Sequence, residues 1–114
     1  MNGYDIYDRA MIRLGFKATG KNEIMDAGIM SRAVEFINQI AADLKLKPIE
    51  DLSDNIVCSA ELSEALCCGV AMLISLSEAD ANKNVIFTAL YNAKRAAVLS
   101  GKTFIEDTLP TAEG

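Results

Sequence analysis

The stretch Ala65–Leu76, ALCCGVAMLISL, contains one polar side chain, Ser75, in a dozen residues. A helix that is apolar on every side has to be covered on every side. A helix that spans a bilayer needs about 20 apolar residues, so this stretch is too short to be one. It therefore predicts the central helix of a small soluble bundle.

Length and composition agree with a single globular domain. The chain has 114 residues, of which 51 % are hydrophobic and only 2 are proline. That is enough for one domain with a modest core and is unlike a disordered chain. The first ten residues lack a cationic start followed by an apolar block, so we expect no signal peptide.

The three cysteines, Cys58, Cys67 and Cys68, are an odd number, and two of them are adjacent within the apolar stretch. Adjacent cysteines in a helix have poor geometry for a disulfide. We interpret all three as reduced thiols in a cytosolic setting, where they serve as small core residues.

Apolar periodicity predicts helices over residues 4–15, 27–44 and 60–78, and a fourth that ends near Leu99. Asp80 or Asn82 is the expected N-cap of the fourth helix, and Ser59 that of the third. The apolar stripes are expected at Tyr7, Ala10, Met11 and Leu14; at Met30, Val34, Ile37, Ala41 and Leu44; and at Ile86, Leu90, Ala93 and Ala97, with Phe87, Tyr91 and Val98 beside the last set and Asn84, Thr88, Asn92 and Arg95 on its polar face.

The breaks between helices define the expected organisation. Gly15 and the pair Ser100–Gly101 are expected helix stops, and Pro48 is expected to end the second helix. Residues 45–58 read as a long irregular loop, with a short strand as the alternative. The predicted fold is all-α: a compact bundle of about four helices in residues 1–101, followed by an extended C-terminal arm in 102–114 that is disordered beyond Pro110.

The sequence offers little for catalysis. It contains no histidine, no glycine-rich phosphate loop and no serine in a nucleophile elbow. Glu61 and Glu64 share helical spacing, but we interpret them as a solvated helix start. We therefore expect no enzyme activity, no cofactor and no metal.

Two groups of residues are candidates for protein interaction. Lys94 and Arg95 form a basic spot on an alanine-rich helix, which is either a solvated face or one side of an intermolecular ion pair. The tail carries the apolar residues Phe104, Ile105 and Leu109, which either dock on a partner or fold back on their own bundle.

The C-terminal half resembles the small all-helical head–tail connector (adaptor) proteins of tailed bacteriophages and prophages. The resemblance rests on GVAMLISLSEAD (69–80), FTALYNAKRAA (87–97) and IEDTLP (105–110), with YNAKRA (91–96) as its most particular element. The N-terminal half is compatible with the same family. No catalytic motif is part of the resemblance.

The resemblance implies a structural virion protein whose copies form a homo-oligomeric ring beneath the portal protein. Such a ring extends the DNA channel and gives a tail-side neck protein its docking surface. By position, the 102–110 arm and the 45–58 loop are the expected contact segments. Implied locations are the virion and, during assembly, the cytoplasm of the host bacterium, with no membrane.

Charge is consistent with this implication. The net charge is −5 and the isoelectric point about 4.6. Sequence-specific DNA binding needs a basic face, whereas an acidic wall lets DNA pass without sticking. The alternative hypothesis is a small helical interaction or regulatory module that acts as a monomer or dimer.

Overall fold

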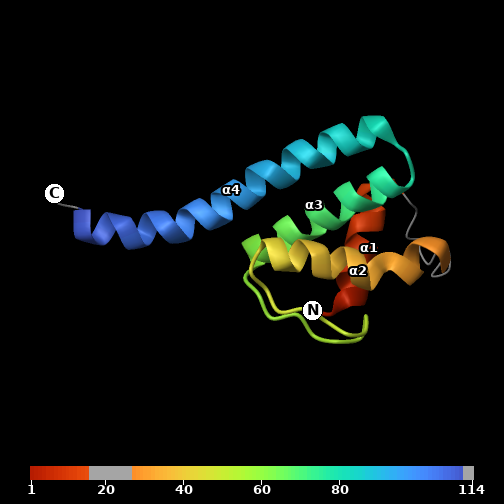
Figure 1. The fold of residues 1–114 in the computed structure, drawn as a ribbon, viewed down its shortest axis with the longest axis horizontal. Coiled ribbons are helices and arrows are strands. Elements are labelled where there is room, and N and C mark those ends of the chain that lie inside the picture. The colour runs from red at the N-terminus through yellow and green to blue at the C-terminus, as the bar shows by residue number, and fades with distance from the viewer. Residues whose placement is uncertain (16–26, 112–114) are drawn as a thin grey trace.

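The computed structural model describes the backbone of residues 1–15 and 27–111 and the side chains of residues 1–15 and 28–100. Within these residues the chain forms four α-helices, which confirms the predicted all-α bundle. Figure 1 shows them in chain order: α1 (Gly3–Arg13), α2 (Ala27–Asp43), α3 (Ala60–Ser77) and α4 (Ala81–Thr111).

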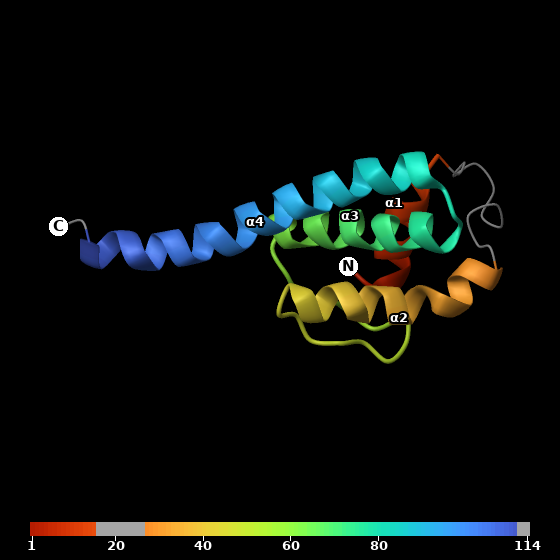
Figure 2. The same cartoon turned by 45° about the horizontal axis from the view of Figure 1, so that its top comes forward.

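The helix α3 is the centre of the bundle, as the apolar stretch predicts. It packs against each of the other three helices, lying between α2 and α4 while α1 crosses behind it (Figures 1 and 2). Leu66, Cys67 and Val70 are completely buried. By length and composition α3 would also pass for a membrane span, but here its neighbouring helices cover it.

A glycine allows these helices to approach α3 closely. A methyl group on Gly69 would lie 2.6 Å from Cγ2 of Ile40 on α2 and 2.9 Å from Cε1 of Tyr91 on α4. Both distances are shorter than van der Waals contact. The absence of a side chain at Gly69 thus sets the spacing of three helices.

Helix starts follow the predicted caps. The Ser59 side chain accepts a hydrogen bond from the Leu62 amide, and Asp80 Oδ1 accepts one from the Lys83 amide, so Asp80 rather than Asn82 caps α4. At α1, Asn2 and Asp5 form a reciprocal capping box.

The end of α2 corrects one prediction, because Pro48 does not set it. The helix ends at Asp43 in a Schellman motif, in which the Leu46 amide donates to the Ala41 carbonyl at 2.7 Å and Lys45 takes the left-handed conformation with φ 64°. Ala79 has the same role after α3, with φ 59°. Gly15, φ 100°, follows α1 as expected.

The segment between α2 and α3 is an irregular loop, as predicted, and it is anchored rather than free. Ile49, Leu52 and Ile56 are buried in the core. The Asn38 amide donates to the Ile49 carbonyl and its oxygen accepts from the Ile49 amide, both at 2.7 Å. The Tyr4 amide donates to the Leu52 carbonyl at 3.1 Å, which ties the loop to the start of α1.

The orientation of α4 is a second correction. Phe87 and Tyr91 are buried on its inner side, whereas Ile86 and Leu90 are 56 % and 41 % exposed. The two aromatic rings bury more apolar surface than alanines could, so they decide which side of the helix faces α3. The predicted apolar stripe Ile86, Leu90, Ala93 and Ala97 is therefore exposed, and Asn84, Thr88 and Arg95 of the predicted polar face are half-buried.

The length of α4 is a third correction. Instead of ending at Ser100–Gly101, the helix continues to Thr111 and runs past the predicted boundary between domain and arm. A glycine inside a helix costs only about 1 kcal/mol relative to alanine, so it does not by itself stop one. Beyond the bundle the helix projects alone (Figure 1). The radius of gyration of 15.5 Å accordingly exceeds the value of about 13 Å for a compact chain of this length.

Candidate interaction surfaces

Asp43, the last residue of α2, joins that helix to α4. Its Oδ2 accepts a hydrogen bond from the Tyr91 hydroxyl and another from Arg95 Nε at 2.6 Å. These bonds favour the carboxylate, and they hold the pKa of Asp43 below its ordinary value, Tyr91 contributing more than Arg95. Burial and the same contact raise the pKa of the Tyr91 hydroxyl.

Glu64 makes a second junction, on α3. Arg13 at the end of α1 holds it with both terminal guanidinium nitrogens, Nη1 at 2.6 Å and Nη2 at 2.7 Å. Lys94 Nζ lies 4.0 Å from the same carboxylate. The hydrogen bond from Arg13 lowers the pKa of Glu64 below its ordinary value. One carboxylate therefore connects α1, α3 and α4.

The two predicted basic residues, Lys94 and Arg95, thus have partners inside the chain. The acid that each one pairs with, Glu64 or Asp43, lies on another helix and far away in sequence. Nothing in local spacing identifies such a partner. An intermolecular role for the two bases stays a prediction, and the structure gives them an intramolecular one.

The predicted tail residues Phe104, Ile105 and Leu109 lie where the structure describes the backbone only. That backbone is helical and continuous with α4. The side chains are outside the described residues, so docking by this arm also stays a prediction.

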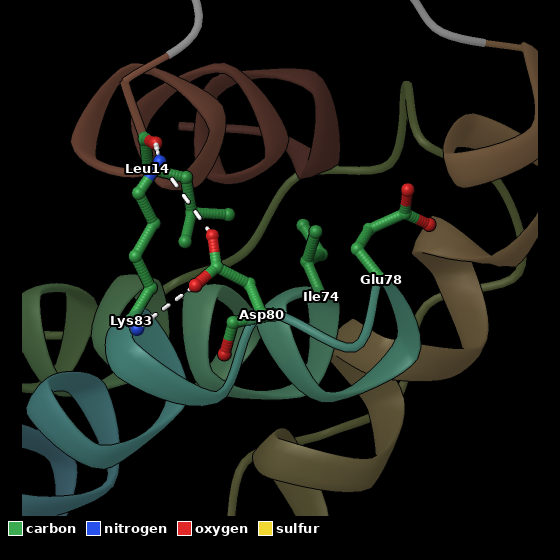
Figure 3. A pocket seen from close by; sticks show the side chains of 6 residues that line it. Leu14, Ile74, Glu78, Asp80 and Lys83 are labelled. Carbon is green, nitrogen blue, oxygen red and sulfur yellow. Dashed lines mark hydrogen bonds and ion pairs between the residues drawn. The ribbon is translucent and has the colours of Figure 1, made fainter.

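The cavity shown in Figure 3 is too small for a drug-sized ligand. It lies among Leu14, Ile74, Glu78, Asp80 and Lys83, with Ser75 also lining it, and has a volume of about 90 Å³. Drug-sized ligands occupy pockets of about 300–1,000 Å³. Lys83 donates to the Leu14 carbonyl and lies 3.8 Å from Asp80, so its charge holds the end of α1 to the start of α4.

Metal and thiol chemistry find little support in the described part of the chain. No group of three or more Cys, Asp or Glu side chains is placed there to hold a metal ion. Burial raises the pKa of Cys67 to about 11, and it also raises those of Cys58 and Cys68. Protonated thiols are poor nucleophiles, so we interpret the cysteines as packing residues.

Exposed aliphatic side chains are the most conspicuous surface feature. Val57, in the loop between α2 and α3, is 84 % exposed, and Val85 on α4 is 68 % exposed. The loop lies beside α2, on the opposite side of α3 from α4 (Figures 1 and 2). Sequence periodicity assigns Ile86 and Leu90 of α4 to the core and therefore misses this exposed surface. The sequence signal that could have found it is the pair of aromatic residues Phe87 and Tyr91, which mark the buried side of the helix.

No family model, curated protein or solved structure matches this chain.

Proposed function

We propose that this protein is a structural virion subunit, a head–tail connector protein that assembles as a ring beneath the portal of a tailed phage or prophage. The ring would extend the DNA channel and receive a tail-side neck protein. The proposal begins from the resemblance of residues 69–80, 87–97 and 105–110 to that family. An all-α fold around an apolar central helix agrees with it.

The observation that carries the proposal is the presence of exposed aliphatics on two elements, the α2–α3 loop and α4, which lie on opposite sides of α3 (Figures 1 and 2). A ring is closed by heterologous contacts, in which one face of a subunit meets a different face of the next. The α2–α3 loop with Val57 and the outer side of α4 with Val85 provide two such faces. Exposed apolar surface of this kind is typical of interaction sites.

Charge supports passive passage of DNA. With a net charge of −5, the subunit lacks the excess of bases that phosphate contacts require. Arg13, Lys94 and Arg95 are moreover paired with acids of the same chain. A channel built from such subunits would repel the DNA backbone rather than hold it.

The second candidate is a small interaction module that acts as a monomer or dimer. The uncharged outer side of α4 favours it, because one helix face is sufficient for docking into a partner groove. This module would need no portal protein.

Electron microscopy with the portal protein of the same genome separates the two. We expect end-on views of a ring of this protein seated on the portal, and loss of that ring when Val57→Asp is introduced in the exposed loop. A portal that binds no copies at high protein concentration would reject the connector and favour the module.

A further inference from the structure

The outer side of α4 carries no charge over about four turns. Every exposed residue from Val85 to Ser100 is uncharged, and most are apolar. The two bases in this range, Lys94 and Arg95, are half-buried and paired with Glu64 and Asp43 of the bundle. We call the exposed residues of this range the outer face of α4.

The absence of charge on the outer face favours a second copy of the same chain as its occupant. Each copy has a net charge of −5, so two copies that approach through their charged surfaces repel each other. Approach through the two uncharged outer faces keeps those charges apart. A surface that binds a basic partner carries exposed acids, and a surface that binds nucleic acid carries exposed bases. The outer face of α4 carries neither. Two outer faces meet without burying any charge, which avoids the desolvation penalty of unpaired ions.

The distribution of side-chain size selects an antiparallel arrangement. The larger residues Val85, Ile86 and Leu90 lie in the first part of the face, and alanines 93, 96 and 97 lie in the last part. A two-fold axis at the level of residue 91 sets Val85 against the partner's Ala97 and Ile86 against the partner's Ala96. Val85 and Ile86 each meet an alanine, twice by symmetry, while Leu90 lies opposite Asn92 near the axis, so the helices can approach closely at both ends of the face.

We propose that the outer face of α4 is a dimerisation surface on which two copies pack antiparallel about a two-fold axis. The face is about 24 Å long, at about 1.5 Å per residue. One helix face of this length buries less than the roughly 800 Å² per partner of a standard interface. The dimer is therefore expected to be weak and concentration-dependent.

The pairing uses a face that the proposed ring also draws on, the outer side of α4, so the two contacts exclude each other at that face. A two-fold contact joins identical faces and closes at two copies, whereas a ring needs two different faces. The two failures are distinguishable, because a protein that is monomeric at all concentrations but forms a ring on the portal rejects only the pairing, and a dimer that forms no ring on the portal rejects only the ring.

Sedimentation equilibrium of the full chain over a wide concentration range tests the pairing. We expect a monomer–dimer equilibrium in the wild type. The variant Ala89→Glu/Ala93→Glu brings carboxylates together at the centre of the pairing, and its dissociation constant should rise at least tenfold. Both positions are exposed in the monomer, so circular dichroism and melting temperature should stay unchanged. Ala42→Glu, at an exposed position of α2, is the matched control and should dimerise like the wild type.

A charge swap tests the direction of packing. In Ala89→Glu/Ala93→Lys, the antiparallel register sets each new acid opposite a new base of the partner, so dimerisation should recover to near the wild-type level. The proposal is overturned if the wild type is monomeric throughout, if the diglutamate variant dimerises normally, or if the charge swap restores nothing. An assembly larger than a dimer that the same glutamates abolish would also overturn it, and would assign the face to a ring contact.

Discussion

Lys45 and Ala79 each hold a left-handed backbone conformation at the end of a helix, with φ of 64° and 59°. For a residue with a Cβ atom this conformation costs about 1–2 kcal/mol. Glycine, the residue that usually occupies this position, avoids the cost because it has no Cβ. Both helices end where they do because the Schellman hydrogen bonds outweigh the strain of a single residue.

Ala79→Gly should therefore stabilise the protein by about 0.5–1 kcal/mol, because relief of strain exceeds the added entropy of the unfolded chain. Urea unfolding followed by circular dichroism measures the change. Ala42→Gly, at an exposed helical position, is the control and should lower stability by about 1 kcal/mol. A loss of stability in Ala79→Gly would contradict the assigned cap.

Asp43 makes the stability depend on pH. The pKa of Asp43 in the folded protein is lowered, chiefly by Tyr91 and then by Arg95. The stability that Asp43 contributes is therefore fully present above the pKa of an aspartate in the unfolded chain, about 3.9, and is lost as the pH falls through the lower pKa of the folded protein. The contribution is at most about 1 kcal/mol, since Asp43 and Arg95 are 40 % and 41 % exposed.

We expect Asp43→Asn to be less stable than the wild type near pH 7 and the difference to shrink below pH about 4. Urea unfolding at a series of pH values measures the difference. Tyr91→Phe removes the stronger donor and should retain only a part of the pH dependence. A difference between the wild type and Asp43→Asn that is constant with pH would show that the carboxylate contributes no charge-dependent stability.

Among the helices, α3 and α4 differ in what decides which of their sides is buried. In α3 the stretch Ala65–Leu76 has a single polar residue, Ser75, so its central place follows from composition and needs no knowledge of the neighbours. In α4, by contrast, apolar residues occur on both sides, as Ile86 and Phe87 illustrate. Which side is buried depends on where Gly69 leaves room for the ring of Tyr91 and where Asp43 accepts from Arg95.

Val70→Asp should unfold the domain, because an unpaired carboxylate at this fully buried position of α3 costs several kcal/mol. Circular dichroism and thermal melting measure the loss. Val85→Asp makes the same chemical change at an exposed position of α4 and should alter stability by less than about 0.5 kcal/mol. A folded Val70→Asp protein with unchanged melting would show that α3 is not the centre of the core.

The whole molecule combines a bundle with a projecting helix. Its extents of 55 × 31 × 22 Å arise because α4 runs beyond α3, the one helix with which it packs extensively. Isolated helices shorter than about 12–15 residues are marginal in water. The projecting part is therefore the segment of the described chain that would gain most from contact with another subunit.

Deletion of residues 102–114 should leave the melting temperature nearly unchanged and bring the radius of gyration from 15.5 Å to about 13 Å. It should also weaken assembly on the portal, since the removed segment carries the predicted docking residues Phe104, Ile105 and Leu109. Small-angle scattering and thermal melting measure the first two effects. A truncated protein that melts much earlier would show that this segment belongs to the core.

The sequence by itself determined the features that depend on local chemistry. These are the existence of four helices, the cap at Ser59, Asp80 as one of two expected caps of α4, and the central place of α3, since a helix stretch without a polar side has no side to expose. Of the candidate site, it identified Lys94 and Arg95 as unusual, but it could not supply their partners Asp43 and Glu64.

Only the tertiary structure decided the rest: which side of α4 is buried, how far that helix runs, and which surface remains uncharged and exposed. The physical reason is that α4 has apolar residues on two of its sides. Local periodicity then does not distinguish the two orientations, and contacts with residues distant in sequence choose between them.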